Sequence, residues 1–449
     1  MIHAYKLGGY NIILDACSGS IHSVDDVAYE AICVRENIGT DDARKLLKSN
    51  FPEIRESEID ELLSDIDSLI EGGKLFALDN YSPIKTDKAP SLKALCMNVS
   101  HVCNMSCAYC FAGRGEYGGS EGLMSLETGK RAIDFLVENS AGRKMLDIDF
   151  FGGEPLLNWS VVKEIVRYAR QVGKESGKEF RFTLTTNGLD IDEDVIEFSN
   201  REMYNVVLSL DGRDDVHNKH RVLPDGEGSY DAVLPKLKEI VESRDGKGYY
   251  IRGTFTPDNL DFVSDILHIA DMGFKEISLE PSVAKPGSDF GFTKEDLPEL
   301  FSQYELLAEQ MLSRQREGRG FKFYHYTLDL SGGPCVHKRI AGCGVGTEYM
   351  AVTPNGKLYP CHQFVGDDEF VIGDVWRGIV NEGLRDKFDG VDIYSRADCK
   401  ECWAKFFCSG GCAANAYNDT GVLNGIYEIG CELFKKRLEC AIMMKVVGL

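Results

Sequence analysis

The sequence lacks long apolar stretches. No hydrophobic run approaches the roughly 20 residues that a membrane-spanning helix needs, so we expect no membrane partner. The first residues, Met1-Ile2-His3-Ala4-Tyr5-Lys6, also lack the charged region, apolar core and cleavage site of a secretory signal. Together these absences predict a cytoplasmic protein. Tandem repeats and low-complexity tracts are missing as well.

Positive charge is scarce. Lys and Arg total 50 against 72 Asp and Glu, which gives a formal net charge of −22. Such an excess repels phosphate backbones, so we expect no nucleic-acid partner. The 449 residues exceed one ordinary domain and predict two or three. Hydrophobic residues at 43% are sufficient for buried cores.

Cysteine, in contrast, is abundant. The chain has 15 cysteines, and a reducing cytoplasm excludes a disulfide framework. Cys17, Cys33, Cys96 and Cys440 stand alone in apolar surroundings and are predicted to be buried core residues. The others are grouped at short spacings, which is typical of iron–sulfur or zinc sites. These are Cys103, Cys107 and Cys110; Cys335, Cys343 and Cys361; and Cys399, Cys402, Cys408, Cys412 and Cys431.

The first part of the chain, 1–82, is predicted to be a separate module. Two β-like runs, 5–7 and 11–15, flank Gly8-Gly9, a hairpin signal. Helical patterns follow, and the combination suggests a small winged-helix-like unit. A polar, Pro-flanked linker is predicted over 83–91. The helices are expected at 23–35, 41–48 and 56–71.

From Leu92 the pattern alternates between strand and helix. Six such units predict an α/β domain with a parallel sheet, either an open sheet or a partial barrel, in which loops after the strands carry the chemistry. The strands are expected at 93–99, 145–151, 180–186, 205–210, 249–255 and 276–280. The helices are expected at 127–139, 161–175, 193–199, 230–243, 262–272 and 295–314. The remaining stretch is rich in loops and cysteine, and we expect its fold to depend on metal.

Cys103-x3-Cys107-x2-Cys110 directly follows the first of these strands. Three thiolates on one loop can hold three irons of a four-iron cube and leave the fourth iron open to the amine and carboxylate of an amino acid. The alternative is a zinc site. Zinc needs four ligands, and the nearest additional one in the sequence is His101.

With this motif, the sequence resembles the radical S-adenosylmethionine (SAM) superfamily, whose three-cysteine motif follows the first strand of a partial (β/α)6 barrel. The resemblance implies that residues 92–332 form this barrel and bind one [4Fe-4S] cluster and SAM. It also implies reductive cleavage of SAM to a radical that removes a substrate hydrogen, with electrons from ferredoxin or flavodoxin. In this interpretation Glu154 accepts hydrogen bonds from the methionyl ammonium and Arg221 faces the carboxylate. The expected SAM-binding residues are Tyr109, Gly152, Gly153, Glu154, Thr185, Asn187, Ser209, Asp211 and Arg221.

The later cysteines resemble the SPASM extension of radical enzymes, here over 333–449, which houses two auxiliary [4Fe-4S] clusters. The resemblance assigns Cys399, Cys402, Cys408 and Cys431 to an outer cluster. It assigns Cys343, Cys361 and Cys412 to an inner one. Cys335 or a substrate thiolate would complete the inner cluster. A treble-clef zinc module is the alternative.

Residues 1–82 resemble the peptide-recognition domain of modified-peptide biosynthesis, in which a leader peptide adds as a strand to a three-stranded sheet. A purely structural cap is the alternative. The whole arrangement is similar to thioether-forming maturases of the sactipeptide and ranthipeptide type, and most closely to those that act on six-cysteine-in-forty-five-residue precursors. This resemblance implies a cysteine-rich precursor peptide with a leader as substrate. Alternatives are carbon–carbon cross-linking, formylglycine formation, or a non-catalytic zinc-binding scaffold for peptides.

Overall fold

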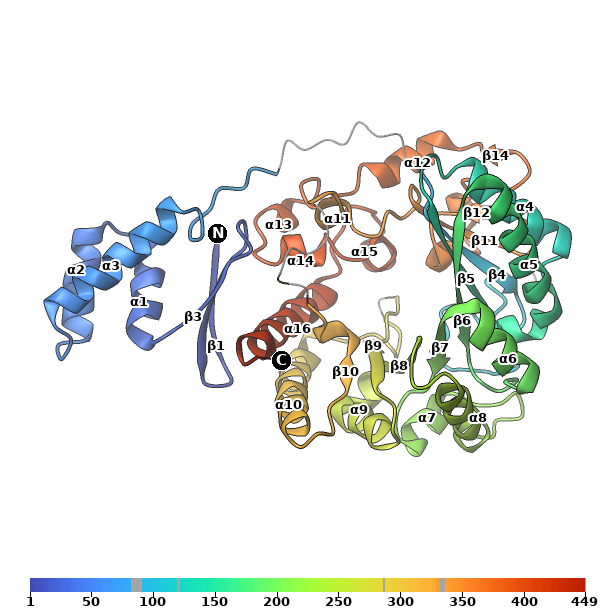
Figure 1. Ribbon diagram of the computed structural model, residues 1–449, viewed down its shortest axis with the longest axis horizontal. Helices are drawn as coiled ribbons and strands as arrows, with labels where there is room; N and C mark the ends of the chain where they lie inside the picture. The colour runs from blue at the N-terminus through green and yellow to red at the C-terminus, as the bar shows by residue number, and fades with distance from the viewer. Residues whose placement is uncertain (82–90, 119–121, 286, 329, 331–335, 449) are drawn as a thin grey trace.

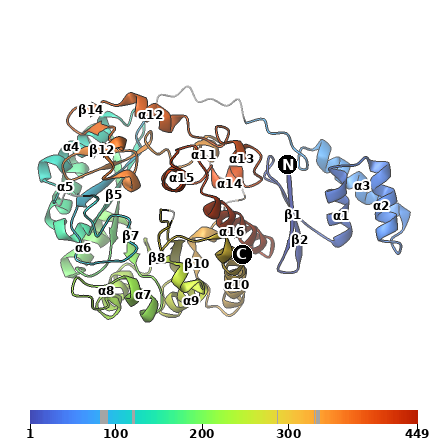
Figure 2. The same ribbon diagram turned by 180° about the vertical axis from the view of Figure 1, so that it is seen from behind.

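The computed structural model describes residues 1–81, 91–118, 122–285, 287–328, 330 and 336–448. Cys335 and the linker predicted at 83–91, apart from Ser91, lie outside these residues. Within them, no helix combines the length and the apolar character needed to cross a bilayer. The molecule is elongated, with the N-terminal helices at one end and a crescent of strands and helices at the other (Figures 1 and 2).

The N-terminal module contains an antiparallel sheet and three helices. Strands β1 (Ile2–Leu7) and β2 (Tyr10–Asp15) are joined through Gly8 and Gly9, whose φ angles of 58° and 82° suit a tight hairpin. A third strand, β3 (Ile21–Val24), pairs with β2. Helices α1 (Asp26–Arg35), α2 (Thr40–Asn50) and α3 (Glu56–Glu71) follow.

The helix predicted from Ser23 is wrong at its start. Ser23 and Val24 belong to β3, and α1 begins only at Asp26. Asp25 caps this helix, because its carboxylate accepts a hydrogen bond from the Ala28 N–H. Sequence periodicity did not show the third strand, because the pairing with β2 that forms it is a tertiary contact.

The second unit has six parallel strands in sequence order, which confirms the parallel-sheet prediction. On β5, Leu146, Ile148 and Phe150 are buried on one face, whereas Asp147 and Asp149 alternate onto the other. The strands are β4 (Ala94–Ser100), β5 (Met145–Gly152), β6 (Glu179–Thr186), β7 (Met203–Ser209), β8 (Tyr249–Phe255) and β9 (Glu276–Pro281). The helices are α4 (Leu126–Glu138), α5 (Trp159–Ser176), α6 (Glu193–Glu202), α7 (Asp214–His220), α8 (Tyr230–Ser243), α9 (Phe262–Asp271) and α10 (Leu297–Arg316).

The sheet continues beyond the six predicted strands at both edges. The short β10 (Lys322–Phe323) runs parallel to β9, and β11 (Tyr349–Val352) runs parallel to β4. Three further antiparallel strands follow β11, so the sheet crosses the boundary predicted at residue 332. They are β12 (Lys357–Tyr359), β13 (Gly373–Asp374) and β14 (Gly378–Ile379).

The C-terminal part is less irregular than expected, because it ends in a helix of 19 residues, α16 (Glu428–Val446). This helix packs on α10 and lies beside β1 of the N-terminal module (Figure 1). The preceding helices are α11 (Val336–Ala341), α12 (Glu382–Asp389), α13 (Ala397–Lys400), α14 (Lys405–Cys408) and α15 (Ala413–Thr420). Short 3₁₀ helices occupy Pro155–Asn158, Pro257–Asn259, Lys294–Asp296, Tyr324–Tyr326, His362–Phe364 and Asp368–Phe370.

Candidate active site

A cavity of about 480 Å³ lies inside the crescent, at the carboxyl ends of its strands. Cys103, Cys107 and Cys110 line it from the loop after β4. This is the position expected for catalytic groups in a parallel α/β fold. Nearly all of the predicted SAM-binding residues line the same cavity: Tyr109, Gly152, Gly153, Glu154, Thr185, Asn187, Ser209 and Arg221.

The three-cysteine loop is anchored to the last residue of α7 and to the segment that follows it. The Ser106 N–H donates to the Val222 carbonyl at 2.8 Å, and the Ala108 N–H donates to the His220 carbonyl at 2.9 Å. Burial raises the pKa of the Cys103 thiol to about 12, and the nearby Cys107 and Cys110 thiols contribute to the rise. Burial also raises the pKa of the Cys107 thiol, so Cys103 and Cys107 are poor thiolates on their own and fit a group whose positive metal ions favour the thiolate form.

Glycines let the end of β5 approach this loop closely. A Cβ on Gly152 would lie 2.2 Å from the Ser100 carbonyl oxygen, and one on Gly153 would lie 2.3 Å from that of Val102. Gly115 fits equally tightly, since its Cβ would lie 2.8 Å from the Gly153 Cα. The close approach expected at Gly152-Gly153 is thus made to the cysteine loop of the protein itself. Gly115 was not identified from the sequence.

Glu154 is almost completely buried, at 1% exposed. Its carboxylate accepts hydrogen bonds from the N–H groups of Leu156 (3.0 Å) and Asn187 (2.8 Å) and from the Thr186 hydroxyl (2.8 Å). Burial raises its pKa to about 7, although these hydrogen bonds oppose the rise. A cation in the adjoining cavity would favour the ionised form.

Tyr109, Arg221 and Asp211 form one buried chain of contacts. The Tyr109 hydroxyl donates to Asp211 and accepts from Arg221 Nη1 at 3.2 Å. The other Asp211 oxygen accepts from the Thr254 N–H at 3.0 Å, so this carboxylate is 1% exposed and lies behind Tyr109. Arg221 Nε is buried without a hydrogen-bond partner among the described residues. An unsatisfied guanidinium N–H beside the cavity suits an anionic ligand.

Asn187 is hydrogen-bonded to the cysteine loop. Its amide nitrogen donates to Asn104 Oδ1 at 2.8 Å and lies 3.8 Å from Cys103 Sγ. Its Oδ1 accepts from the Leu189 N–H at 2.9 Å. Thr185 and Ser209, in contrast, line the cavity without such a contact to the cysteine loop among the hydrogen bonds of the described residues. The ribose contact expected from the motif at 185–188 is therefore available from Thr185, while Asn187 positions the loop.

The later cysteines fall into two separate groups. Cys431 on α16 lies next to the thiols of Cys399, Cys402 and Cys408. Burial and these neighbouring thiols raise the pKa of Cys431 to about 12. Cys361 is buried and lies near Cys343 and Cys412, and burial together with these thiols raises its pKa to about 12. Among the described residues no three Cys, His, Asp or Glu side chains converge on a single ion. The structure thus brings together the same two sets of thiols that the resemblance assigns to the outer and inner clusters.

Of the solitary cysteines, Cys17, Cys96 and Cys440 are buried as predicted, whereas Cys33 is half-buried. Cys33 is on α1 and packs at the edge of the N-terminal core, which explains its partial exposure. Cys96 lies in β4, and its side chain reaches the cavity wall. Cys96 is thus buried as predicted, but the sequence analysis did not anticipate that it also lines the cavity.

Aromatic rings connect the two cysteine regions. Phe111 follows Cys110, His362 follows Cys361, and their ring centroids lie 5.7 Å apart. Phe151 packs against both, at 6.5 Å from Phe111 and 5.2 Å from His362. His362 and Gln363 also line the cavity, so its wall extends from the first cysteine loop to the residues beside Cys361. This contact depends on tertiary packing and had no sequence signal.

A buried charged cluster forms another part of the wall. Glu280 on β9 lies 2.9 Å from His325 Nε2 and 3.9 Å from Arg437 Nη1 of α16. His325, Arg437 and Arg252 hold the pKa of Glu280 at about 2, although burial opposes this. The carboxylate is therefore ionised and engaged. These residues come from distant segments, and the sequence analysis did not identify them.

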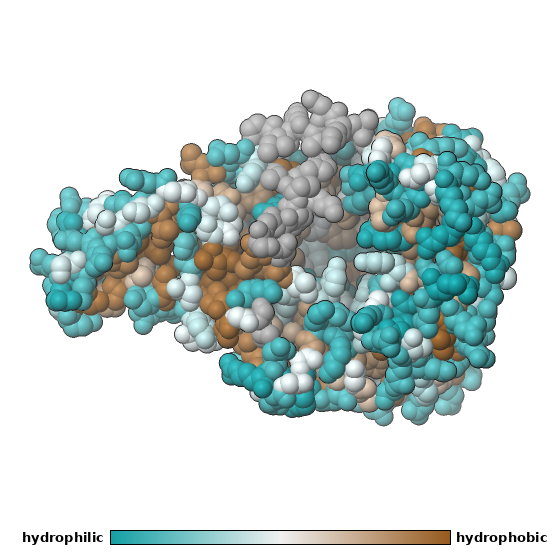
Figure 3. Space-filling model, in the orientation of Figure 1, coloured by the Kyte–Doolittle hydropathy of each residue, from teal (hydrophilic) through white to brown (hydrophobic). Residues whose placement is uncertain are grey.

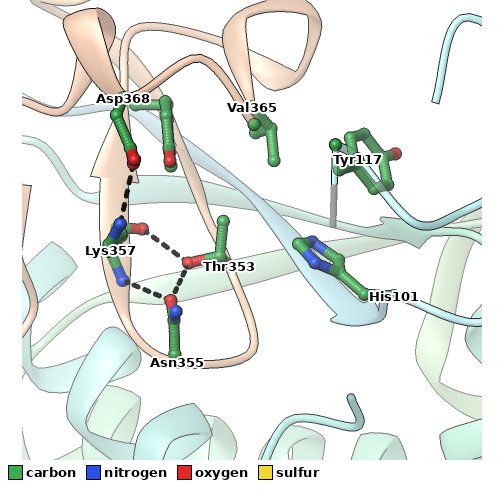
Figure 4. A pocket seen from close by; sticks show the side chains of 10 residues that line it. His101, Tyr117, Thr353, Asn355, Lys357, Val365 and Asp368 are labelled. Atoms are coloured by element: carbon green, nitrogen blue, oxygen red, sulfur yellow. Dashed lines mark hydrogen bonds and ion pairs between the residues drawn. The ribbon is translucent and has the colours of Figure 1, made fainter. Parts of the chain in front are cut away.

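A second cavity, of about 210 Å³, is lined by residues of the loop after β4 and of the segment from Thr353 to Asp368 (Figure 4). Its polar side chains bond mainly to one another. Thr353 Oγ1 donates to Asn355 Oδ1 at 2.6 Å, and Lys357 Nζ lies 2.8 Å from Asp368 Oδ1. No cysteine is among the described residues that line it. It is a weaker candidate for a catalytic site than the cavity of the crescent.

Comparison with protein families agrees with this geometry. Residues 97–282 match the radical SAM superfamily, and residues 343–403 match SPASM, an iron-sulfur cluster-binding domain. The radical SAM cyclopropyl synthase TigE of Paramaledivibacter caminithermalis is 23% identical over 389 residues, covering 78% of this chain and 74% of TigE. A cysteine-type anaerobic sulfatase-maturating enzyme of Clostridium novyi is 24% identical over 376 residues, covering 78% of this chain and 95% of the relative.

Solved structures share the fold. The enzyme anSMEcpe with bound AdoMet superposes with a TM-score of 0.64 at 19% identity, covering 79% of this chain and 98% of its own. Streptococcus suis SuiB bound to its precursor peptide SuiA gives a TM-score of 0.54 at 15% identity, covering 95% of this chain and 97% of its own. The family matches include the first cysteine loop, and they agree with the cavity beside it and with the grouping of the later cysteines. The chain therefore contains a radical SAM domain followed by an SPASM iron-sulfur cluster-binding domain.

Proposed function

We propose that this protein is a radical SAM peptide maturase that joins a cysteine sulfur to a carbon of another residue in a ribosomally synthesised precursor peptide. One observation carries the proposal. A single cavity extends from Cys103, Cys107 and Cys110 to His362 and Gln363, directly after Cys361. A peptide in this cavity would have one residue near the first cluster and another near the inner auxiliary cluster.

The residues present fit the cofactors. Cys103, Cys107 and Cys110 would hold the first cluster, and Glu154 and Arg221 would orient the amino-acid part of SAM. SAM and its cluster supply the hydrogen abstraction, and the protein supplies position and shelter from water. Cys399, Cys402, Cys408 and Cys431 would hold the outer auxiliary cluster.

Cys343, Cys361 and Cys412 would hold an inner cluster with a position left for the thiolate of the substrate. Cys343 and Cys412 are exposed, which suits a site that a peptide must reach. A small reduced iron–sulfur protein or flavoprotein, such as ferredoxin or flavodoxin, would donate electrons.

The N-terminal module would bind the leader of a cysteine-rich precursor. Strand β3 pairs with β2 along one edge, and its other edge has no strand partner among the described residues. Its Ile21 and Val24 are half-buried, and hydrophobic side chains gather near this sheet (Figure 3). An added peptide strand would gain backbone hydrogen bonds there. The likeness to SuiB supports this role. SuiB is solved with a precursor peptide, and its superposition covers 95% of this chain.

The test begins with iron and sulfide analysis of anaerobically prepared protein. About twelve irons per chain are expected for three four-iron clusters. Zinc in place of iron would contradict the proposal and favour a peptide-binding scaffold.

The protein is then incubated with SAM, a strong reductant and a cysteine-containing precursor. A thioether product loses two hydrogens and one alkylatable thiol. Loss of two hydrogens with all thiols retained would instead indicate carbon–carbon cross-linking, and a formylglycine product would indicate sulfatase-type maturation.

A further inference from the structure

Asp149 on β5 lines the cavity. Its neighbours in register are Cys96 on β4 and Thr183 on β6, and the Thr183 side chain bonds to its carboxylate. Tyr250 on β8 and Tyr349 beside β4 also face it. These four groups are neutral at pH 7, because burial raises the pKa of Cys96 and of both tyrosines.

Among the described residues, Asp147, two residues earlier on the same face, is the one charged group that contributes to the raised pKa of Asp149. Asp147 is itself neutralised by Arg181, whose Nε and Nη2 lie 2.7 and 3.0 Å from its oxygens. Among the described residues no cationic side chain lies within ion-pair distance of Asp149. Asp149 is therefore a half-buried carboxylate without a counter-ion.

The other carboxylates around the cavity are engaged. Glu280 pairs with His325, Glu154 accepts three hydrogen bonds, and Asp211 accepts from Tyr109 and Thr254. Of the acidic groups described here, Asp149 accepts the fewest hydrogen bonds from the protein, so its carboxylate oxygens can still accept a hydrogen bond from a group in the cavity. It also lies on the wall that leads from the first cysteine loop to His362.

We propose that Asp149 is the catalytic base that accepts the proton of the substrate cysteine. This inference rests on the proposed function. Joining R–S–H to R′–H with loss of two hydrogens removes two protons and two electrons. One hydrogen atom leaves R′ in the step that SAM supplies. The S–H bond breaks with its proton passing to the Asp149 carboxylate, and the sulfur pair forms the S–C bond. The four-iron cluster that Cys343, Cys361 and Cys412 would hold would supply the acceptor for the remaining single electron.

The acid–base properties of Asp149 suit this role. Burial, with a contribution from Asp147, raises its pKa to about 6. The group is thus ionised at pH 7 and is a stronger base than an exposed aspartate, which matches proton transfer from a thiol of pKa near 8.5. We therefore expect thioether formation to increase as the pH rises through about 6.

The experiment compares Asp149→Asn and Asp149→Glu with the matched variant Asp147→Asn, whose carboxylate does not line the cavity. Iron content, precursor affinity by fluorescence anisotropy and peptide-free release of 5′-deoxyadenosine are measured first. All three are expected within about twofold of the unsubstituted protein. Precursor deuterated at the acceptor residue then reports hydrogen abstraction separately from thioether formation.

For Asp149→Asn we expect continued transfer of deuterium to 5′-deoxyadenosine and a fall of about 100-fold in thioether formed per deoxyadenosine. Asp149→Glu should restore part of this ratio with a shifted pH profile. Asp147→Asn removes one cause of the raised pKa of Asp149, and it should keep the ratio within about twofold at pH 8, where Asp149 is ionised with or without that neighbour. An unchanged ratio in Asp149→Asn would overturn the assignment while leaving the proposed function intact. If the unsubstituted protein gives a product that retains every thiol, the proposed function fails, and the assignment fails with it.

Discussion

Arg221 links the cysteine loop to the proposed SAM site. It caps the end of α7, is 9% exposed and bonds to the Tyr109 hydroxyl, which is next to Cys110. Its Nε remains without a partner among the residues described. Arg differs from Lys here, because a planar guanidinium can satisfy Tyr109 and a carboxylate at once.

We expect Arg221→Lys to weaken SAM binding about 10- to 100-fold, the loss of a charged hydrogen bond of about 1.5–3 kcal/mol. Equilibrium dialysis of anaerobic, iron-loaded protein with labelled SAM measures this affinity. Arg167→Lys, on the exposed face of α5, is the matched control. Equal affinities in the two variants would exclude Arg221 from the SAM site.

At the scale of elements, the end of β5 is fixed by its contact with the cysteine loop. Gly152 has a φ of 134° and lies against the Ser100 carbonyl. The Gly153 N–H donates to the same carbonyl at 2.7 Å, and the Glu154 N–H donates to Val102 at 2.9 Å. This strand end therefore positions both Glu154 and the loop that bears the thiols.

Gly152→Ala should destabilise the protein by about 3 kcal/mol, because the added Cβ meets backbone and the φ angle is unfavourable for alanine. Urea unfolding of anaerobic protein and its iron content measure the effect. Gly142→Ala, in a position where a Cβ would meet nothing within 4 Å, should change neither. Similar behaviour of the two variants would contradict the account of this contact.

Helix α16 joins three parts of the molecule. Cys431, near its start, lies with the outer cysteine group, whereas Cys440, two turns later, is fully buried beside Tyr326. Glu439 on the same helix bonds to His3 at 2.9 Å and accepts at its carbonyl from the Tyr5 hydroxyl at 3.0 Å.

Cys431→Ser should lower the iron content by about four per chain, the content of one cluster. Cys440→Ala on the same helix should retain all iron and cost only about 1 kcal/mol for a small cavity. Iron and sulfide analysis separates the two. Full iron in Cys431→Ser would remove this residue from the outer cluster.

At the scale of the whole molecule, the N-terminal module docks on the SPASM part. His3 stacks on Trp403 with ring centroids 3.6 Å apart, and Asp79 reaches Lys405 Nζ at 2.7 Å and the Tyr394 hydroxyl at 2.9 Å. The Lys405 side chain is only 3% exposed. A leader bound at the module would therefore be held beside the outer cysteine group, with the core peptide extending toward the cavity.

Asp79→Ala should loosen this docking by about 2 kcal/mol, because it leaves a buried ammonium without its carboxylate. Hydrogen–deuterium exchange should become faster at α14, which begins at Lys405. Asp41→Ala removes an 86% exposed carboxylate from the same module and should leave α14 unchanged. Unchanged exchange in Asp79→Ala would show that other contacts hold the module.

Sequence by itself determined the features that depend on local spacing. The alternation on β5, the run of strand–helix units, and the cysteine pairs and triplets all reflect the order of neighbouring residues, so the parallel sheet and the composition of the first cysteine loop followed from them. The same local logic misassigned Ser23 and Val24, because β3 exists through pairing with β2. It also missed β11 beside β4, a pairing of residues about 250 positions apart.

Tertiary structure alone decided which polar groups are engaged. Asp147 and Asp149 are equivalent in the sequence pattern, yet only Asp147 meets Arg181, because the register of β5 and β6 places that guanidinium opposite it. Glu280 is engaged through His325 and Arg437, which come from segments far along the chain. The protonation state of a carboxylate depends on the charges and dielectric that packing brings to it, and these are set by three-dimensional distance rather than by position in the sequence.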